Sequence, residues 1–214
     1  GKSSLVRAGL VPALLGGFLV HDRDRWRRVS IKPGDAPMAN LAAGLVAAMS
    51  DDPDAEAMSG SPEAQSLEAA LRAGHTPAAL DYVRPRLEAN ANLFVLVDQF
   101  EELFAFRGDD DSDDQPDADP ERRKERARRK AEASDFVDLL LTLADQRELP
   151  VYVVLTMRTD FLGDCRLFFG LPEALNRGRY LVPRMTREQL RDAVECPALL
   201  AGAEVAPRLL DHVL

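Results

Sequence analysis

Unbroken apolar runs at two places in the chain predict buried β-strands. Residues 93–97 (LFVLV) and 151–157 (VYVVLTM) lack the alternation of a half-exposed strand, and such runs are typical of strands covered on both faces of a parallel sheet. A third strand is predicted over 26–32 (WRRVSIK), which ends at a Pro-Gly turn signal. A shorter run at 179–182 (RYLV) predicts a strand that closes the sheet.

Helical patterns occupy the segments between these strands. Serine residues open an apolar-periodic helix over 3–10, which Pro12 is expected to end or to kink. Further helices are predicted over 38–49, 63–73, 77–89, 99–106 and 133–147. Because strands and helices alternate, the pattern favours βαβ units and a doubly wound α/β sheet. From Thr186 onward two helices follow without a strand between them, which predicts that a helical second domain begins there.

One charged insert interrupts this pattern. Residues 109–119 carry seven Asp and no base, whereas residues 121–130 carry seven Arg or Lys against two Glu. Charge blocks of this kind are typical of solvated, disordered chain. We therefore expect a disordered insert over 109–132, with a docking tail for a partner as the alternative.

Composition excludes several classes of protein. The chain has 214 residues and a formal charge of −9, which suits one domain and the start of a second. Its longest uncharged stretch, residues 36–50, is shorter than the roughly 18 apolar residues of a membrane span. The net acidity argues against nucleic acid as a partner, because phosphate contacts need clustered Lys and Arg. Two cysteines are too few for a disulfide framework and fit a reducing, cytoplasmic location.

The first residues match the end of a phosphate-binding loop. Gly1, Lys2 and Ser3 are the last part of the pattern G-x-x-x-x-G-K-[ST], whose first five positions are missing. In that pattern Lys reaches the β and γ phosphates and the hydroxyl residue binds Mg²⁺. Gly1, Lys2, Ser3 and Ser4 are therefore candidate cofactor-binding residues, and the expected cofactors are ATP or ADP with Mg²⁺.

A carboxylate follows the first apolar run. Asp98 stands directly after residues 93–97, at the strand end where an open α/β sheet binds its ligands. A carboxylate there can order the water shell of Mg²⁺. Glu101 and Glu102 follow three and four residues later, and either is a candidate for polarising the water that attacks a γ-phosphate. The alternative is an Asp that caps a helix bearing two surface acids.

An arginine follows the second apolar run. Arg158 is expected at the same edge of the sheet, where a guanidinium can bind a γ-phosphate and stabilise charge in the transition state. The alternative is an ordinary ion pair between Arg158 and Asp160.

Five ordered stretches together resemble the bacterial STAND ATPases, the signal-transduction ATPases with numerous domains. The resemblance is closest to the novel group that is often followed by WD-repeat propellers, and it covers nearly the whole chain. The stretches are GKSSLVRAGLVPAL, WRRVSIKPGDAP, LFVLVDQFEELF, VVLTMRTDFLGDC and LVPRMTREQLRDAVECPA.

The resemblance implies a fold and a set of roles. The fold would be a P-loop NTPase-type parallel sheet sandwiched by helices over residues 1–185, without its first strand, followed over 186–214 by the start of a helical lid. Lys2 would bind phosphate, Ser3 and Asp98 would serve Mg²⁺, Glu101 would be the catalytic base and Arg158 a first sensor.

The resemblance also implies a signalling switch. ADP would hold a closed monomer, and exchange for ATP would open the module, cause self-association and recruit an effector domain that precedes it. Sensor repeats would follow it. Because the strand and glycines before Gly1 are missing, we expect this stretch alone to bind ATP weakly or not at all, to be inactive, and to expose the edge of its sheet.

Two other functions stay open at this point. One is a non-hydrolysing, nucleotide-gated scaffold that keeps the fold without turnover. The other is a DNA-linked ATPase of the AAA+ or origin-recognition type, which would require a basic winged helix beyond residue 214.

Overall fold

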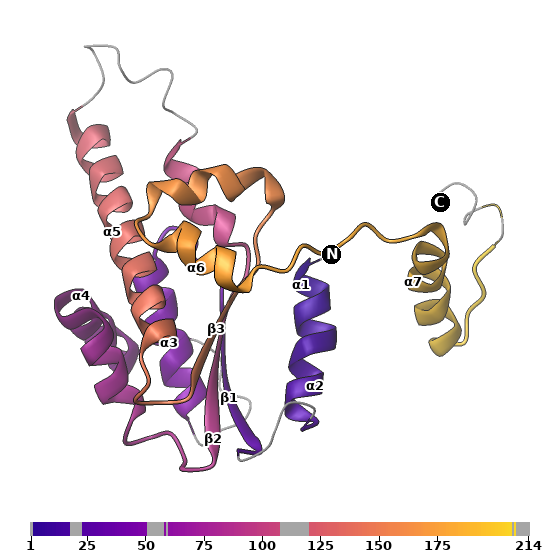
Figure 1. Ribbon diagram of the computed structural model, residues 1–214, viewed down its shortest axis with the longest axis horizontal. Helices are drawn as coiled ribbons and strands as arrows, with labels where there is room; N and C mark the ends of the chain where they lie inside the picture. Colours follow the sequence, from indigo (N-terminus) through magenta and orange to yellow (C-terminus); the bar gives the residue numbers. More distant parts are fainter. Residues whose placement is uncertain are drawn as a thin grey trace. The chain divides into compact units, whose positions relative to one another are not determined.

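A parallel sheet organises the larger part of the molecule (Figure 1). The computed structural model describes residues 2–17, 23–50, 58, 60–107, 120–206 and 208. Within them the sheet has the order β1-β2-β3, with β1 at Arg25–Ile31, β2 at Ala91–Val97 and β3 at Val151–Leu155. All three strands are parallel, and Val95 of β2 lies opposite Val29 and Val153. The predicted α/β sheet with flanking helices is confirmed.

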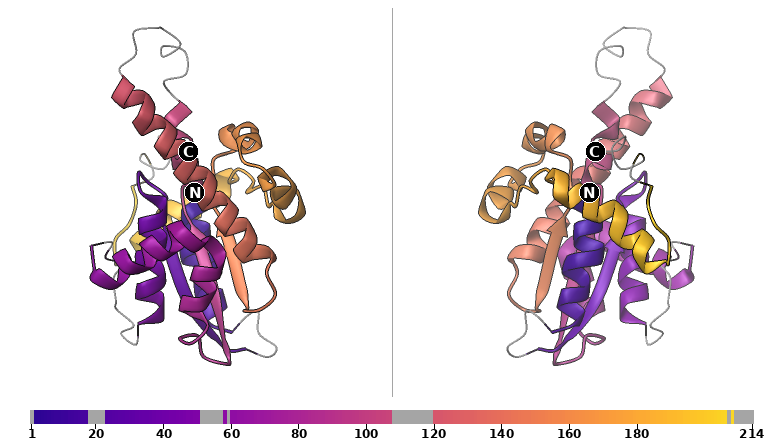
Figure 2. Two further views of the ribbon diagram at one scale, coloured as in Figure 1. Left: turned by 90° about the vertical axis from the view of Figure 1, so that its left-hand side faces the viewer. Right: turned by 90° about the vertical axis from the view of Figure 1, so that its right-hand side faces the viewer.

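Helices cover both faces of this sheet (Figures 1 and 2). All seven residues of β2 are buried, as its unbroken apolar run predicts. Leu93, Val95 and Val97 pack in the core with α3 (Pro37–Met49), α4 (Pro62–Val83) and α5 (Pro120–Asp145). Phe94 and Leu96 pack on the opposite face with η1 (Val6–Leu10) and α2 (Val11–Leu15). The alternation of the strand therefore gives each helical layer its own half of the core.

The first helical run contains a π-helical turn. It comprises α1 (Lys2–Leu5), the π-helix η1 (Val6–Leu10) and α2 (Val11–Leu15). The N–H of Val11 donates to the carbonyl of Val6, five residues back. Pro12 therefore lies in the first turn of α2, where the structure tolerates its missing N–H. The prediction that Pro12 ends the helix is wrong, because helical residues continue to Leu15; a kink at Pro12 stays a prediction.

Helix α4 runs unbroken over Pro62–Val83, with Pro77 in its interior. The prediction of two helices, 63–73 and 77–89, is wrong here. Leu71 lies before Pro77 and Leu80 after it, and both are buried in the same core. Packing of this continuous apolar face offsets the hydrogen bond that Pro77 cannot make.

Helix α5 spans Pro120–Asp145 and includes the basic half of the charged insert. The expectation of disorder is wrong for residues 120–132, while residues 109–119 lie outside the described residues. Glutamates spaced within the basic block form ion pairs along the helix, such as Arg129 with Glu125 at 3.1 Å. At Glu132 the helix reaches the core, because this side chain is buried and bound by Arg72 at 2.8 Å.

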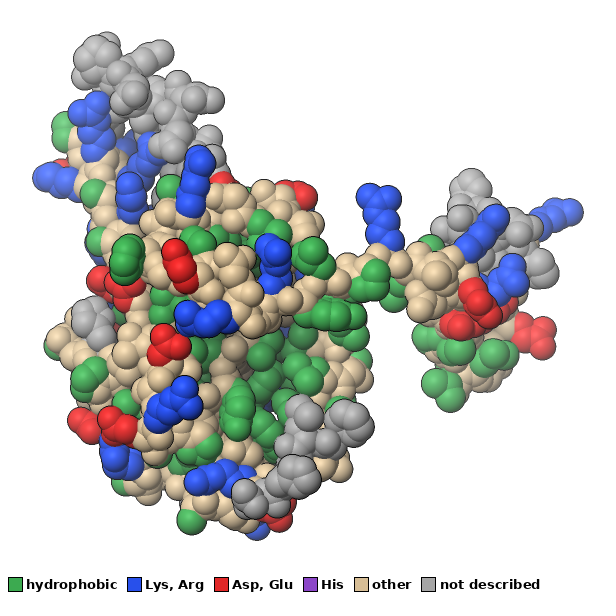
Figure 3. Space-filling view, viewed as in Figure 1, with side chains coloured by type: hydrophobic (Ala, Val, Ile, Leu, Met, Phe, Trp, Pro, Cys, Tyr) green, Lys and Arg blue, Asp and Glu red, His purple; other side chains and the backbone are tan. Residues whose placement is uncertain are grey.

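Strand β3 forms one edge of the described sheet. Its Tyr152 side chain is about half exposed, at 51%. Figure 3 shows hydrophobic side chains on the surface between this edge and the first helical run.

The chain divides into two compact units, Gly1–Gly178 and Arg179–Leu214. The first unit ends with η3 (Thr159–Leu167) and α6 (Leu171–Gly178). In the second unit, α7 (Arg187–Leu200) begins at a capping box formed by Thr186 and Gln189. The further helix predicted near the end of the chain lies outside the described residues, apart from Arg208.

The strand predicted at 179–182 is not formed. Tyr180, Leu181 and Val182 are exposed to 75%, 55% and 41%, and the segment has no regular structure. A run of four residues bounded by Pro183 gains little without a neighbouring ladder to pair with. The prediction that it closes the described sheet is therefore wrong.

Candidate functional site

Asp98 lies at the carboxyl end of β2 with its side chain almost fully buried. Its backbone N–H donates to the carbonyl of Ile31 at 2.8 Å, which continues the ladder one residue beyond the strand. Only 2% of the side chain is exposed. The carboxylate is therefore held at the edge of the sheet where ligands bind in folds of this class.

Ser3 reaches this carboxylate from the start of the chain. Its hydroxyl donates to Oδ1 of Asp98 at 2.7 Å, across 95 residues of sequence. The first helical run packs on the sheet through Val6, Val11 and Leu14, and this packing brings its first turn to the carboxyl edge. The structure thus brings together the two residues that the sequence assigns to Mg²⁺.

Thr156, at the end of β3, holds the same carboxylate and was not a candidate from the sequence. Its hydroxyl donates to Oδ1 of Asp98 at 2.5 Å and accepts from the N–H of Gln99 at 3.1 Å. Its carbonyl accepts from the N–H of Phe100 at 2.9 Å. The signal in the sequence was a polar residue inside the apolar run 151–157. Thr156 fixes both the carboxylate and the turn that follows it.

Arg7 completes the surroundings of Asp98. Its Nη2 lies 2.9 Å from Oδ2 of Asp98, the oxygen that Ser3 and Thr156 leave free. Burial by itself raises the pKa of the Asp98 carboxyl. The hydrogen bonds from Thr156 and Ser3, the Arg7 guanidinium and the N–H of Gln99 outweigh it and hold that pKa below its ordinary value. Asp98 is therefore an ionised, buried acceptor.

The turn after Asp98 leads into two glutamates whose surroundings differ. Gln99 adopts φ = 58°, which is uncommon for a residue other than glycine, and η2 (Phe100–Arg107) starts directly after it. Glu102 Oε2 accepts from the N–H of Gly34 at 3.0 Å. Glu101 Oε2 is buried without a hydrogen-bond partner among the described residues. Glu102 is thus engaged with the loop after β1, whereas Glu101 keeps an unused acceptor.

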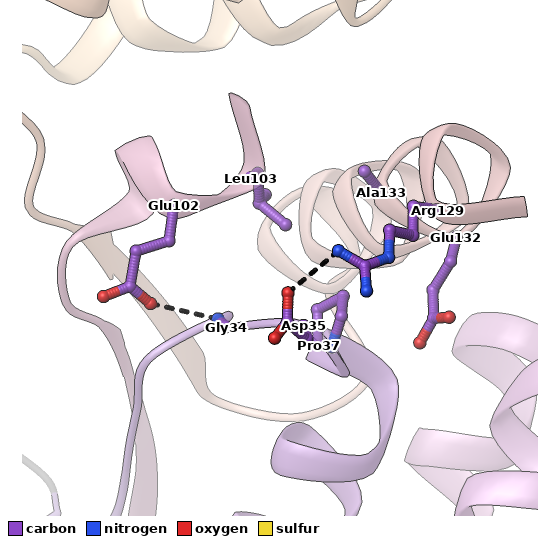
Figure 4. Close-up of a pocket in the computed structure, with 8 residues that line it drawn as sticks. All are labelled: Gly34, Asp35, Pro37, Glu102, Leu103, Arg129, Glu132 and Ala133. Carbon is purple, nitrogen blue, oxygen red and sulfur yellow. Dashed lines mark hydrogen bonds and ion pairs between the residues drawn. The ribbon is translucent and has the colours of Figure 1, made fainter. Parts of the chain in front are cut away.

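Glu102 also lines a small surface pocket between the β1–α3 loop, η2 and α5 (Figure 4). Asp35 and Arg129 form an ion pair there at 3.2 Å, and the pocket carries both signs of charge. Its lining residues are Gly34, Asp35, Pro37, Glu102, Leu103, Arg129, Glu132 and Ala133.

The structure pairs Arg158 with Asp160. Its side chain is 62% exposed, and its Nη2 lies 2.6 Å from Oδ2 of Asp160. The contact seen is therefore the ordinary ion pair that the sequence left open as the alternative.

The remaining candidates lie at the first turn. Lys2 is half-buried and Ser4 is exposed at the start of α1. Gly1 lies outside the described residues.

The side-chain oxygens of Asp98 and Ser3 suit a Mg²⁺ ion that is bound together with phosphate. Mg²⁺ prefers oxygen ligands and usually takes one or two from protein, with water and substrate phosphate as the others. The Ser3 hydroxyl and the Asp98 carboxylate are such oxygens, and they are already in contact. Within the described ranges no cluster of three or more His, Cys, Asp or Glu side chains forms a metal cage. The residues fit a metal that arrives with a nucleotide.

A comparison with protein-family models decides the family. The model described as Novel STAND NTPase 1 matches residues 1–214. This chain belongs to that STAND NTPase family. The resemblance read from the sequence is thereby confirmed, and membership makes the chain a nucleotide-binding NTPase module of a class of signalling proteins that oligomerise.

Two further comparisons found no relative of this STAND chain. Neither the curated proteins nor the solved structures gave a match. Among its described residues no helix is long and apolar enough to cross a bilayer.

Proposed function

We propose that this chain is the ATP-binding and ATP-hydrolysing core of a STAND signalling switch, with Mg²⁺·ATP held at Asp98. The observation that carries the proposal is the 2.7 Å hydrogen bond between Ser3 and Asp98. It joins the end of a phosphate-loop pattern to the acid after a buried strand, which is the pair of residues that holds Mg²⁺ in P-loop NTPases.

The first helical run would bind the phosphates. Lys2 stands at its first residue, where the helix dipole favours an anion. The ammonium group of Lys2 is a compact charge suited to phosphate oxygens. Ser3 and Asp98 supply oxygen ligands at the same point, and Mg²⁺ bound there would neutralise charge on the phosphates. Gly1 and Ser4 complete the candidate contacts.

Glu101 is the better of the two candidates for general base. Its Oε2 is buried and accepts no hydrogen bond from the described residues, so it is free to accept a proton from a water. Glu102 already accepts the N–H of Gly34. The family resemblance, which assigns the base to the acid three residues after Asp98, points to the same residue.

A non-hydrolysing scaffold is the second candidate function, and the state of Arg158 favours it. The guanidinium that would stabilise γ-phosphate charge is exposed and paired with Asp160. Hydrolysis therefore requires Arg158 to exchange this partner for phosphate. The proposed signalling switch also includes regulation by self-association, an effector domain and sensor repeats, and this part of the proposal rests on the family alone.

Single-turnover release of γ-phosphate distinguishes the two functions. The full-length protein is used throughout. Glu101→Gln is compared with Glu102→Gln as the matched control. For a base we expect E101Q to keep ATP affinity and to slow release by about 100-fold or more. E102Q should retain most of the rate. No phosphate release by the unaltered protein would support the scaffold, whereas release at an unchanged rate in E101Q would show that Glu101 is not the base.

A further inference from the structure

Arg7 occupies the place of a cation at Asp98. Oδ1 of Asp98 accepts from Ser3 and Thr156, and Oδ2 faces the Arg7 guanidinium at 2.9 Å. A carboxylate that is only 2% exposed needs a compensating charge. Among the described residues, Arg7 supplies that charge. The function proposed above requires Mg²⁺ to use this same carboxylate.

The two cations compete at one acid. A guanidinium and a Mg²⁺ ion that share a single carboxylate repel each other, and the repulsion is strong where water is excluded. Asp98 carries one negative charge, and its other partners, Ser3 and Thr156, are neutral hydroxyls. Arg7 in contact with Oδ2 therefore opposes the binding of Mg²⁺ at this carboxylate.

The geometry of Arg7 allows it to move away from Asp98. Its side chain is 53% exposed, whereas that of Asp98 is 2% exposed. Arg7 can therefore withdraw into water without leaving a buried charge of its own. It also lies in η1, a single π-helical turn, and such turns occur frequently at functional sites.

We propose that Arg7 is a built-in counter-ion that holds metal-free Asp98 and is displaced when Mg²⁺ binds with nucleotide. This inference rests on the proposed nucleotide function and adds a regulatory step to it. Arg7 stabilises the buried Asp98 carboxylate and opposes the entry of Mg²⁺. Loading of the switch is therefore set by the Mg²⁺ concentration as well as by the nucleotide.

The test measures how much Mg²⁺ the protein needs to bind nucleotide. Fluorescent ADP is titrated into the full-length protein at a series of free Mg²⁺ concentrations. Arg7→Gln removes the charge, and Arg7→Lys keeps a charge on a shorter side chain. Arg84→Gln is the matched control, because it removes an ion pair with Glu148 in the loops that lead into β2 and β3, at the other edge of the sheet.

In R7Q we expect the half-saturating Mg²⁺ concentration to fall about fivefold, which corresponds to about 1 kcal/mol. R7K should lie between R7Q and the unaltered protein, and R84Q should match the latter. Melting temperature gives a second readout. R7Q should melt earlier than the unaltered protein in EDTA, and the difference should shrink when Mg²⁺ and ADP are saturating.

Three results would overturn the inference. An unchanged Mg²⁺ requirement in both R7Q and R7K would show that Arg7 does not compete. Loss of ADP binding in R7Q at every Mg²⁺ concentration would show that Arg7 is a nucleotide ligand instead. Absence of ADP binding by the unaltered protein would overturn the proposed function and this inference together, which distinguishes it from the first two results.

Discussion

The hydroxyl of Ser3 donates to Oδ1 of Asp98 at 2.7 Å, and this contact joins the first turn of the chain to the end of its central strand. Asp98 Oδ1 also accepts from Thr156 at the end of the neighbouring strand. Three segments that are far apart in sequence thus meet at one buried oxygen. The candidate site therefore forms only when folding brings these three segments to one edge of the sheet, and no single sequence motif contains it.

Thr156 should contribute to stability as well as to the site. Thr156→Val removes the donor to Asp98 and the acceptor for the Gln99 N–H while preserving the shape of the side chain. We expect the free energy of unfolding to fall by about 1–3 kcal/mol, because two buried polar groups lose a partner. Urea denaturation measures it. Thr156→Ser keeps the hydroxyl and should cost less, and a larger loss in Thr156→Ser than in Thr156→Val would show that the methyl group matters instead.

Gly44 allows α3 to approach β1 closely. A Cβ at this position would lie 2.8 Å from both Val29 Cγ1 and Ile31 Cγ2. Gly44→Ala should therefore destabilise the protein by about 1–3 kcal/mol through overpacking. Gly74 is the control, because it is also in a helix but its Cβ would meet Ala78 Cβ at an ordinary 3.5 Å.

Gly74→Ala should be neutral or should stabilise by up to about 1 kcal/mol, because alanine favours the helix. Thermal or urea unfolding of the two variants gives the comparison. Equal behaviour of G44A and G74A would contradict the close approach of α3 to the sheet.

The ion pair between Arg27 and Glu88 predicts a pH dependence of stability. Arg27 Nε and Nη2 donate to Glu88 at 3.1 and 2.5 Å, and these bonds lower the pKa of Glu88 below its ordinary value. A lowered carboxyl pKa stabilises the fold above the ordinary value of 4.5, and this contribution is lost as the pH falls through the folded pKa.

Glu88→Gln should therefore cost on the order of 1 kcal/mol at pH 7 and progressively less below pH 4.5. Urea unfolding at several pH values measures this change. A deficit that stays constant down to the acid transition would mean that the ion pair contributes nothing.

The sequence predicted the central strand and its terminal acid for a clear physical reason. An apolar run such as 93–97 is buried on both faces, and parallel strands end at a common edge, so Asp98 had to lie there. Ser3 was placed at the same edge by a motif whose chemistry requires contact with Mg²⁺.

Other features depend on tertiary packing, which local patterns do not contain. The sequence predicts two helices over 63–73 and 77–89, yet buried residues on both sides of Pro77 keep α4 continuous. Thr156 and Arg7 lie within the family stretches, but their contacts with Asp98 became visible only when β3 and η1 were placed beside it. Arg158 shows the converse, because a position at a strand end does not fix which partner an exposed side chain takes.

The central claim is that Asp98 holds Mg²⁺ together with ATP, and an affinity measurement tests it most directly. ATP binding is measured by calorimetry with and without Mg²⁺, for the unaltered full-length protein and for its Asp98→Asn variant. Asparagine keeps the size of the side chain and removes its charge. The account predicts that Mg²⁺ strengthens ATP binding by the unaltered protein by about tenfold or more and has little effect on D98N. An equal effect of Mg²⁺ on both proteins would contradict it.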